Sequence, residues 1–166
     1  TVANYEYCFY YNFDQSGEIS FDVLATGILS TTPVDPDNKE PCEFGTRVGK
    51  GVLGPYHQHM FSLRIDPCID GDGNSLQVVD SVPMPLDKYN PYGIGYKTES
   101  RTVKESGTEE LDVAKGRVFK IINPNKINPT SLLPVGYKLV PIVSQMLLAD
   151  PSSWHSRRSN FADHPI

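Results

Sequence analysis

Apolar and polar residues alternate with a period of two along much of this chain, a pattern typical of β-strands. The alternation is most regular near the start, where residues 4–13 place five aromatic rings on one face. Polar turn residues follow at 14–17, and the alternation resumes over residues 18–29. The pattern predicts that these two segments form a β-hairpin.

Further alternating segments predict strands at residues 46–53, 76–82, 94–105, 113–122 and 137–143. Prolines and glycines separate them, and residues 31–44 contain three prolines, as a surface loop would. Charged side chains occur on both faces of residues 96–105, which favours an edge strand. Only residues 143–149 and 151–158 have the pattern of short helices. Short strands with almost no helix predict an all-β fold, an antiparallel β-sandwich.

One predicted strand, residues 55–66, carries two histidines on the face that continues into its apolar side chains. Side chains two apart on a strand point the same way, so His57 and His59 are expected to lie roughly 6.5–7 Å apart along it. Two imidazoles aimed together are half of a metal site, and they suit copper, zinc, iron or nickel. The same spacing also fits two half-buried histidines that hydrogen-bond to backbone or water.

Composition limits the other functional classes. The 166 residues are 39% apolar, enough for one domain with a core. The net charge of -5 is spread along the chain, which argues against a nucleic-acid partner. No apolar run approaches the roughly 20 residues of a membrane span. The three cysteines are too few for a disulfide scaffold, and with the lack of a glycosylation sequon they favour an intracellular protein.

The first seven residues, Thr-Val-Ala-Asn-Tyr-Glu-Tyr, resemble the cofactor motif Thr-x-x-Asn-Tyr-(Asp/Glu) of the copper-containing amine oxidases. That family places a His-x-His pair about fifty residues downstream, where this chain has His57 and His59. Residues 61–75 and 119–129 are also similar to the family. The resemblance covers essentially the whole chain and points to the fungal, peroxisomal-type members.

The resemblance implies a set of roles. Tyr5 would be the precursor of topaquinone, a quinone cofactor with an electrophilic carbonyl, and His57 and His59 would be ligands of Cu(II). Asn4 would orient the cofactor ring, and Glu6 would sit beside it and tune it. The implied reaction takes a primary amine and dioxygen to an aldehyde, ammonia and hydrogen peroxide.

Two features of the family are not matched in this chain. The third copper histidine and the catalytic aspartate have no counterpart, and His155 and His164 are expected to be surface or loop residues. Asp66 matches an aspartate of a peripheral calcium or manganese site, but Cys68 stands where some members have a second aspartate. Because a thiol is a poor ligand for a hard cation, Asp66 could equally cap a turn.

The resemblance therefore implies that residues 1–166 are part of a single catalytic β-sandwich domain, truncated at both ends. The parent protein would be a homodimer, with a peroxisomal location, and this segment alone would be inactive. Two alternatives stay open from the residues themselves. One is a zinc hydrolase that uses His57 and His59, and the other is a non-catalytic β-sandwich module or inactive fragment.

Overall fold

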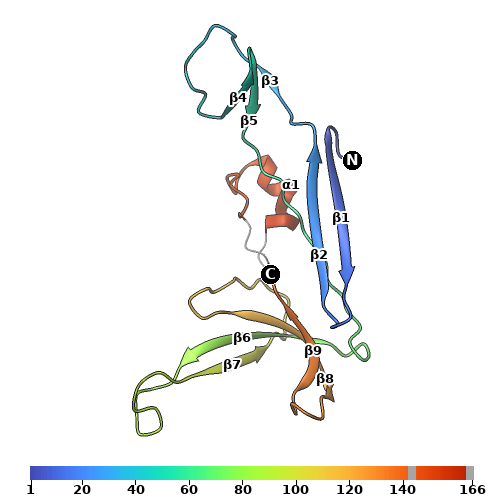
Figure 1. Cartoon of the computed structure of the whole chain (residues 1–166), viewed down its shortest axis with the longest axis vertical. Helices are drawn as coiled ribbons and strands as arrows, with labels where there is room; N and C mark the ends of the chain where they lie inside the picture. Colours follow the sequence, from blue (N-terminus) through green and yellow to red (C-terminus); the bar gives the residue numbers. More distant parts are fainter. Residues whose placement is uncertain (142–144, 164–166) are drawn as a thin grey trace. The chain divides into compact units, whose positions relative to one another are not determined.

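The computed structural model describes residues 1–141 and 145–163. The chain divides into two compact units, Thr1–His59 and Met60–Ile166. In the first unit, β1 (Tyr5–Phe13) and β2 (Ile19–Gly27) pair antiparallel along their whole length. Figure 1 shows them side by side as the two blue strands. The hairpin that the alternation predicted is therefore confirmed.

The first unit also contains a small three-stranded sheet with the order β3-β5-β4. Its strands are β3 (Thr32–Pro33), β4 (Gly45–Gly49) and β5 (Val52–Pro55). The prediction of one strand over residues 46–53 was wrong. Gly51 takes a positive φ of 71°, and a turn at this point divides the segment into two antiparallel strands.

The second unit is built on a four-stranded antiparallel sheet with the order β7-β6-β8-β9. Its strands are β6 (Ser75–Pro83), β7 (Tyr96–Thr102), β8 (Val118–Ile127) and β9 (Pro134–Leu139). As predicted, β7 lies at the edge, and all of its residues are exposed. The strand predicted over residues 113–122 begins later, because residues 113–116 form a turn in which the Gly116 N–H donates to the Val113 carbonyl.

The core of this sheet lies on its two central strands. Val78 of β6 stands opposite Phe119 of β8, and both are fully buried. Beyond Asn123 the register of β8 against β9 shifts, and this irregularity accommodates Pro124 inside the strand. The Asn123 side chain is buried, and its Nδ2 donates to the carbonyls of Ile69 and Asp70. These hydrogen bonds hold the loop before β6 against the sheet.

Two local predictions fail. Residues 56–68 form no strand, because a strand requires a ladder of hydrogen bonds to a neighbour and alternation indicates only which side chains share a face. The one helix in the described residues is α1 (Trp154–Asp163), which begins after Ser153, whose hydroxyl accepts the Ser156 N–H as an N-cap. The predicted helix over 151–158 is thus displaced. Residues 145–149 are not helical, and 143–144 lie outside the described residues.

The predicted fold class is confirmed. Every strand pairing in the described part of the chain is antiparallel, and helix is confined to α1. Among those residues, no helix has the length and apolar character needed to cross a membrane.

Candidate functional site

The backbone at the start of β1 holds Tyr5 in place. Val2 and Tyr5 exchange two backbone hydrogen bonds of 2.9 and 3.0 Å. Asn4 is fastened through both its backbone and its side chain. Its carbonyl accepts the Ile28 N–H at 2.8 Å, its Nδ2 donates to the Ile28 carbonyl, and its Oδ1 accepts the Ser30 hydroxyl at 3.1 Å. These contacts tie the residue before Tyr5 to the chain that leaves β2.

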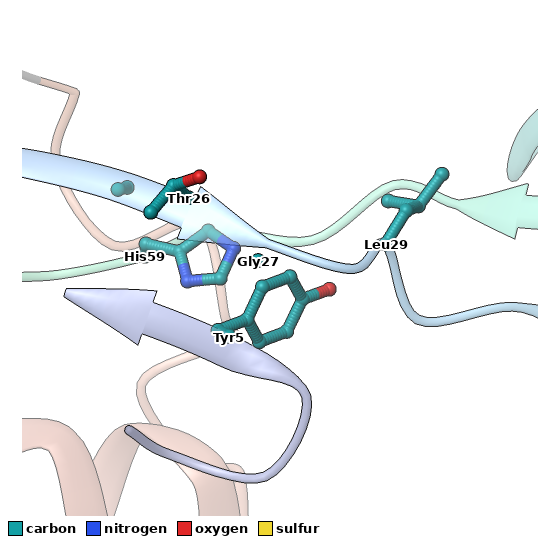
Figure 2. A pocket seen from close by; sticks show the side chains of 6 residues that line it. Tyr5, Thr26, Gly27, Leu29 and His59 are labelled. Carbon is teal, nitrogen blue, oxygen red and sulfur yellow. The ribbon is translucent and has the colours of Figure 1, made fainter.

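Gly27 stands directly opposite Tyr5 in the hairpin, at a φ of 107°. A Cβ at this position would lie 2.5 Å from the Asn4 carbonyl oxygen and 2.8 Å from the Tyr5 Cα, so no other residue fits without displacing β1. An open cavity of about 220 Å³ lies at this point (Figure 2). It is lined by Tyr5, Ala25, Thr26, Gly27, Leu29 and His59.

The Tyr5 hydroxyl lies 2.7 Å from Nε2 of His57, and it also accepts the Ser30 backbone N–H at 3.1 Å. On the other side of the imidazole, His57 Nδ1 lies 2.9 Å from the Pro55 carbonyl oxygen. A carbonyl can only accept, so Nδ1 carries the proton and donates it. Nε2 is therefore the acceptor, and the Tyr5 hydroxyl is the donor. The backbone at Pro55 thus decides which nitrogen of His57 has the free electron pair.

A second tyrosine–histidine pair lies next to the first. The Tyr7 hydroxyl is 2.6 Å from Nδ1 of His59. The ring centroids of His57 and His59 are 4.8 Å apart. The Tyr5 ring centroid lies 4.7 Å from that of His59, with the ring planes 80° apart. Figure 2 shows Tyr5 next to His59. The two histidines share a side as predicted, although residues 56–68 form no strand. The structure therefore brings two phenols and two imidazoles together.

Sequence reasoning missed Tyr7 as a member of this cluster. A signal was present, because the tyrosines and the histidines have the same spacing of two, and each tyrosine meets the histidine 52 residues later. The Ser30 N–H and the Pro55 carbonyl were also missed. Both are backbone groups, which every residue type offers, so no residue pattern could have indicated them.

The donor set fits part of a copper site. Imidazole nitrogens and a phenol oxygen are suitable ligands for Cu(II), and the Pro55 carbonyl leaves the electron pair of His57 Nε2 directed at the Tyr5 oxygen. In the described residues, no group of three or more histidine, cysteine, aspartate or glutamate side chains could hold a metal ion. The cluster thus offers two imidazoles and a phenol as donors, and among the described residues no third histidine is grouped with them.

Other residues singled out from the sequence lie elsewhere. Glu6 is exposed, and strand alternation turns its side chain to the opposite face of β1 from Tyr5. Asp66 forms an exposed ion pair with Arg64 at 3.2 Å. Cys68 donates to the Asp72 carboxylate at 3.3 Å. The roles of Glu6 and Asp66 stay predictions.

The chain has two further histidines, His155 and His164. His155 is exposed on α1, with its ring against Trp154, as expected of a surface histidine. His164 lies outside the described residues.

Comparison with known proteins gives a consistent result. Residues 1–166 match the family model described as copper amine oxidase, enzyme domain. The chain is 46% identical, over its whole length, to copper amine oxidase 1 of Aspergillus niger and to the peroxisomal primary amine oxidase of Pichia angusta. It is 40% identical to the histamine oxidase of Arthrobacter globiformis. It covers 24–25% of these relatives, so it spans about a quarter of their length.

A solved structure agrees with these relatives. The crystal structure of a copper-containing benzylamine oxidase from Hansenula polymorpha matches 98% of this chain with a TM-score of 0.90 and 49% sequence identity. The chain covers 25% of that protein. None of the proteins named here is a hydrolase, and the resemblance found in the sequence is confirmed. This chain belongs to the copper amine oxidase family, and it matches the enzyme domain of that family from its first residue to its last.

Proposed function

We propose that the protein oxidises primary amines to aldehydes with dioxygen, releasing ammonia and hydrogen peroxide, and that Tyr5 is the precursor of its topaquinone. In this proposal His57 and His59 are copper ligands. The observation that carries it is the 2.7 Å contact between the Tyr5 hydroxyl and His57 Nε2, beside a second imidazole whose ring is 4.8 Å away. Family membership supports the reaction type.

Each residue of the cluster has a task that follows from its contacts. Bound copper would supply the redox chemistry that lets a phenol ring react with dioxygen. The Tyr5 hydroxyl donates its proton to His57 Nε2, so both residues would have to give up this shared hydrogen bond in order to hold a copper ion. The Ser30 N–H then still donates to the Tyr5 oxygen and stabilises its negative charge.

The hydrogen bonds of Asn4 support its proposed role in orienting the cofactor. They hold the backbone next to Tyr5 against Ile28 and Ser30, which fixes the point from which the Tyr5 ring projects. The tuning role of Glu6 has no comparable support, because its carboxylate lies on the other face of β1.

We further propose that this chain acts as part of a longer, homodimeric polypeptide that supplies the third histidine and the catalytic base. The support is that the chain spans a quarter of its relatives and contributes two imidazoles to the site. We propose a peroxisomal location by analogy with the peroxisomal primary amine oxidase of Pichia angusta. We also keep the proposal of a calcium or manganese ion at Asp66. It has no structural support, because in the described residues Asp66 is not part of a group of potential metal ligands.

The test is phenylhydrazine labelling of the complete copper-loaded protein, followed by peptide mass spectrometry and measurement of amine turnover. Phenylhydrazine reacts with a quinone carbonyl, so we expect the label on residue 5 and a quinone absorbance band. Tyr5→Phe should lose label, absorbance and turnover while it still binds copper. Tyr10→Phe, on the opposite face of the same strand, is the matched control and should keep all three properties.

Retained turnover in Tyr5→Phe would contradict the proposed precursor. Bound zinc without a quinone band would favour the hydrolase alternative instead. The isolated segment of residues 1–166 is expected neither to oxidise amines nor to form the quinone when copper is added, because in this proposal the third ligand and the base come from the rest of the polypeptide.

A further inference from the structure

The two tyrosine–histidine pairs have the same spacing but use different ring nitrogens. Tyr5 meets His57 at Nε2, whereas Tyr7 meets His59 at Nδ1. We propose that Tyr7 is a positioning residue: its hydroxyl accepts the proton of His59 Nδ1 and thereby directs His59 Nε2 to the metal. This inference rests on the proposed function, in which both histidines bind copper.

The argument begins with the chemistry of imidazole. A histidine that binds a metal through one nitrogen carries its proton on the other, and that N–H needs an acceptor to hold the ring in orientation. For His57 the acceptor is the Pro55 carbonyl oxygen, 2.9 Å from Nδ1. For His59 the atom in the equivalent place is the Tyr7 oxygen, 2.6 Å from Nδ1. One ring is therefore oriented by backbone and the other by a side chain.

Tyr7 is well placed for this task. It lies on β1 two residues after Tyr5, so both rings project from the same face, and their centroids are 6.4 Å apart with the planes 24° from parallel. The residue opposite Tyr7 in the hairpin is Ala25, whose small side chain leaves room for the ring. The Tyr7 side chain is half-buried, and the paired strand fixes the direction in which its hydroxyl points.

The different nitrogens also explain why two similar tyrosines would have different fates. The Tyr5 oxygen lies at the nitrogen that bears the free electron pair, where a metal would bind. The Tyr7 oxygen lies at Nδ1, on the side of His59 away from its proposed metal-binding nitrogen. Tyr5 is thus placed to become a ligand and to react, while Tyr7 stays a phenol that holds the imidazole.

The experiment measures copper binding rather than activity. The complete protein is stripped of metal and titrated with Cu(II) in competition with a chelator of known affinity, and the EPR spectrum of the copper-loaded form is recorded. Loss of a hydrogen-bond partner behind a ligating histidine typically weakens metal affinity by about 10–100-fold, so Tyr7→Phe should raise the Kd by that factor and alter the EPR spectrum. Tyr11→Phe, on the same face further along β1, is the matched control and should leave both unchanged.

A Tyr7→Phe protein with wild-type Kd and EPR spectrum would overturn the inference while leaving the proposed function intact. A wild-type protein that binds no copper would overturn both. Thermal unfolding of the two variants separates a folding defect from a change at the metal: the inference predicts that Tyr7→Phe unfolds like wild type in the metal-free state. A metal-free Tyr7→Phe protein that is unfolded would show that Tyr7 stabilises the hairpin, and would count against a role confined to His59.

Discussion

The hairpin β1–β2 and the four-stranded sheet β7-β6-β8-β9 share an alternating pattern but bury their apolar side chains differently. In the sheet, the four core residues are each at most 7% exposed; they are Val78, Val79, Phe119 and Ile122. In the hairpin, Phe9, Tyr11 and Phe13 are 54%, 59% and 74% exposed. Among the described residues, the sheet therefore contributes most of the buried apolar side chains that stabilise a fold, and Leu53 of β5 is the other one.

The proposed chemistry belongs to the region with little core. Tyr5 and Tyr7 are held by hydrogen bonds to histidines, by Asn4 and by the glycine opposite Tyr5, rather than by surrounding apolar side chains. The comparison suggests that directional contacts position this site and that apolar packing elsewhere stabilises the chain. Three predictions test this division.

The largest expected effect is on the core of the sheet. Phe119→Ala should lower the free energy of unfolding by about 3–5 kcal/mol, because it leaves a cavity beside Val78 where no solvent reaches. The matched change in the hairpin, Phe13→Ala, should change it by no more than about 0.5 kcal/mol, because that ring is already exposed. Urea denaturation measures both. Equal losses would show that the hairpin is packed as tightly as the sheet.

The next effect concerns Gly27. Gly27→Ala should cost about 1–2 kcal/mol for the left-handed backbone alone, and its methyl group would also collide with the carbonyl of Asn4. We expect Tyr5 to shift and quinone formation to fall. Gly17→Ala is the matched control, because Gly17 has a similar φ of 89° but open space where a Cβ would lie.

Quinone formation, followed by absorbance, separates the two contributions. Backbone strain affects both variants, and the collision affects only Gly27→Ala. If Gly17→Ala impaired the quinone as strongly, the close approach at Tyr5 would not be what positions the ring.

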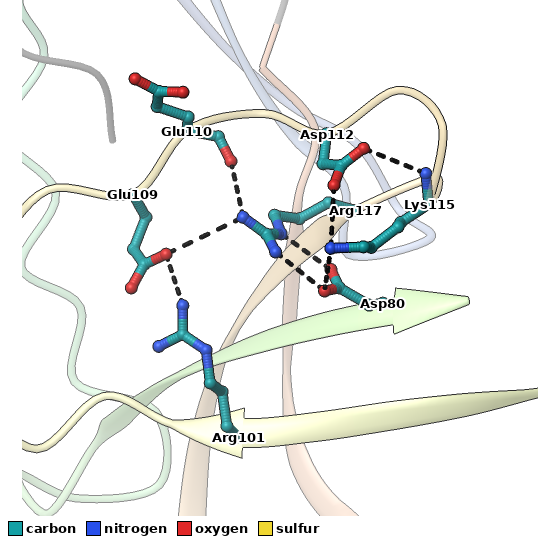
Figure 3. A network of polar contacts seen from close by, with 7 residues as sticks. All are labelled: Asp80, Arg101, Glu109, Glu110, Asp112, Lys115 and Arg117. Carbon is teal, nitrogen blue, oxygen red and sulfur yellow. Dashed lines mark hydrogen bonds and ion pairs between the residues drawn. The ribbon is translucent and has the colours of Figure 1, made fainter. Parts of the chain in front are cut away.

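The smallest effect is electrostatic and belongs to the sheet. Figure 3 shows Arg117, the residue before β8, donating to both carboxylate oxygens of Asp80 on β6. The two hydrogen bonds are 2.7 and 2.8 Å long, and Lys115 lies close to both Asp80 and Asp112. The hydrogen bonds from Arg117 hold the pKa of Asp80 below its ordinary value of 3.8, with further lowering by the charges of Arg117 and Lys115. The pKa of Asp112 is lowered chiefly by its hydrogen bonds to Lys115.

A carboxyl group whose pKa is lower in the folded state stabilises the fold above its ordinary pKa and stops doing so as the pH falls through the lowered value. The sheet should therefore lose stability below about pH 4. In the described residues the hairpin has no ion-pair network; the pKa of Asp14 in its turn is lowered by hydrogen bonds to Ser16 alone. Thermal unfolding over that pH range measures the effect. Asp80→Asn should reduce the pH dependence, and an unchanged profile would remove Asp80 as its source.

Much of the fold was predictable because it depends on local patterns. Apolar side chains occupy every second position of β1 and of most of β2, and polar residues with a glycine separate the two strands, so the hairpin and its turn were predicted correctly. The two failures at 46–53 and 56–68 have different causes. Gly51 adopts a turn that interrupts an otherwise regular alternation, and residues 56–68 have the alternation without a paired neighbour.

The site was predictable in part. The motif around Tyr5 and the spacing of His57 and His59 indicated the family, and the structure brings these three side chains together. The role of Tyr7 beside His59 was not anticipated, because a tyrosine in an aromatic-rich strand has the appearance of an ordinary packing residue.

The amino-acid sequence by itself determined the strand periodicity, the turn of the hairpin, the cofactor-type motif and the family, since each is encoded in neighbouring residues or in a characteristic spacing. Only the tertiary structure decided which imidazole nitrogen each tyrosine hydroxyl contacts. It also decided that the backbone groups of Ser30 and Pro55 hydrogen-bond to Tyr5 and His57. That outcome depends on how two segments 52 residues apart align with each other, and local residue preferences do not specify such an alignment.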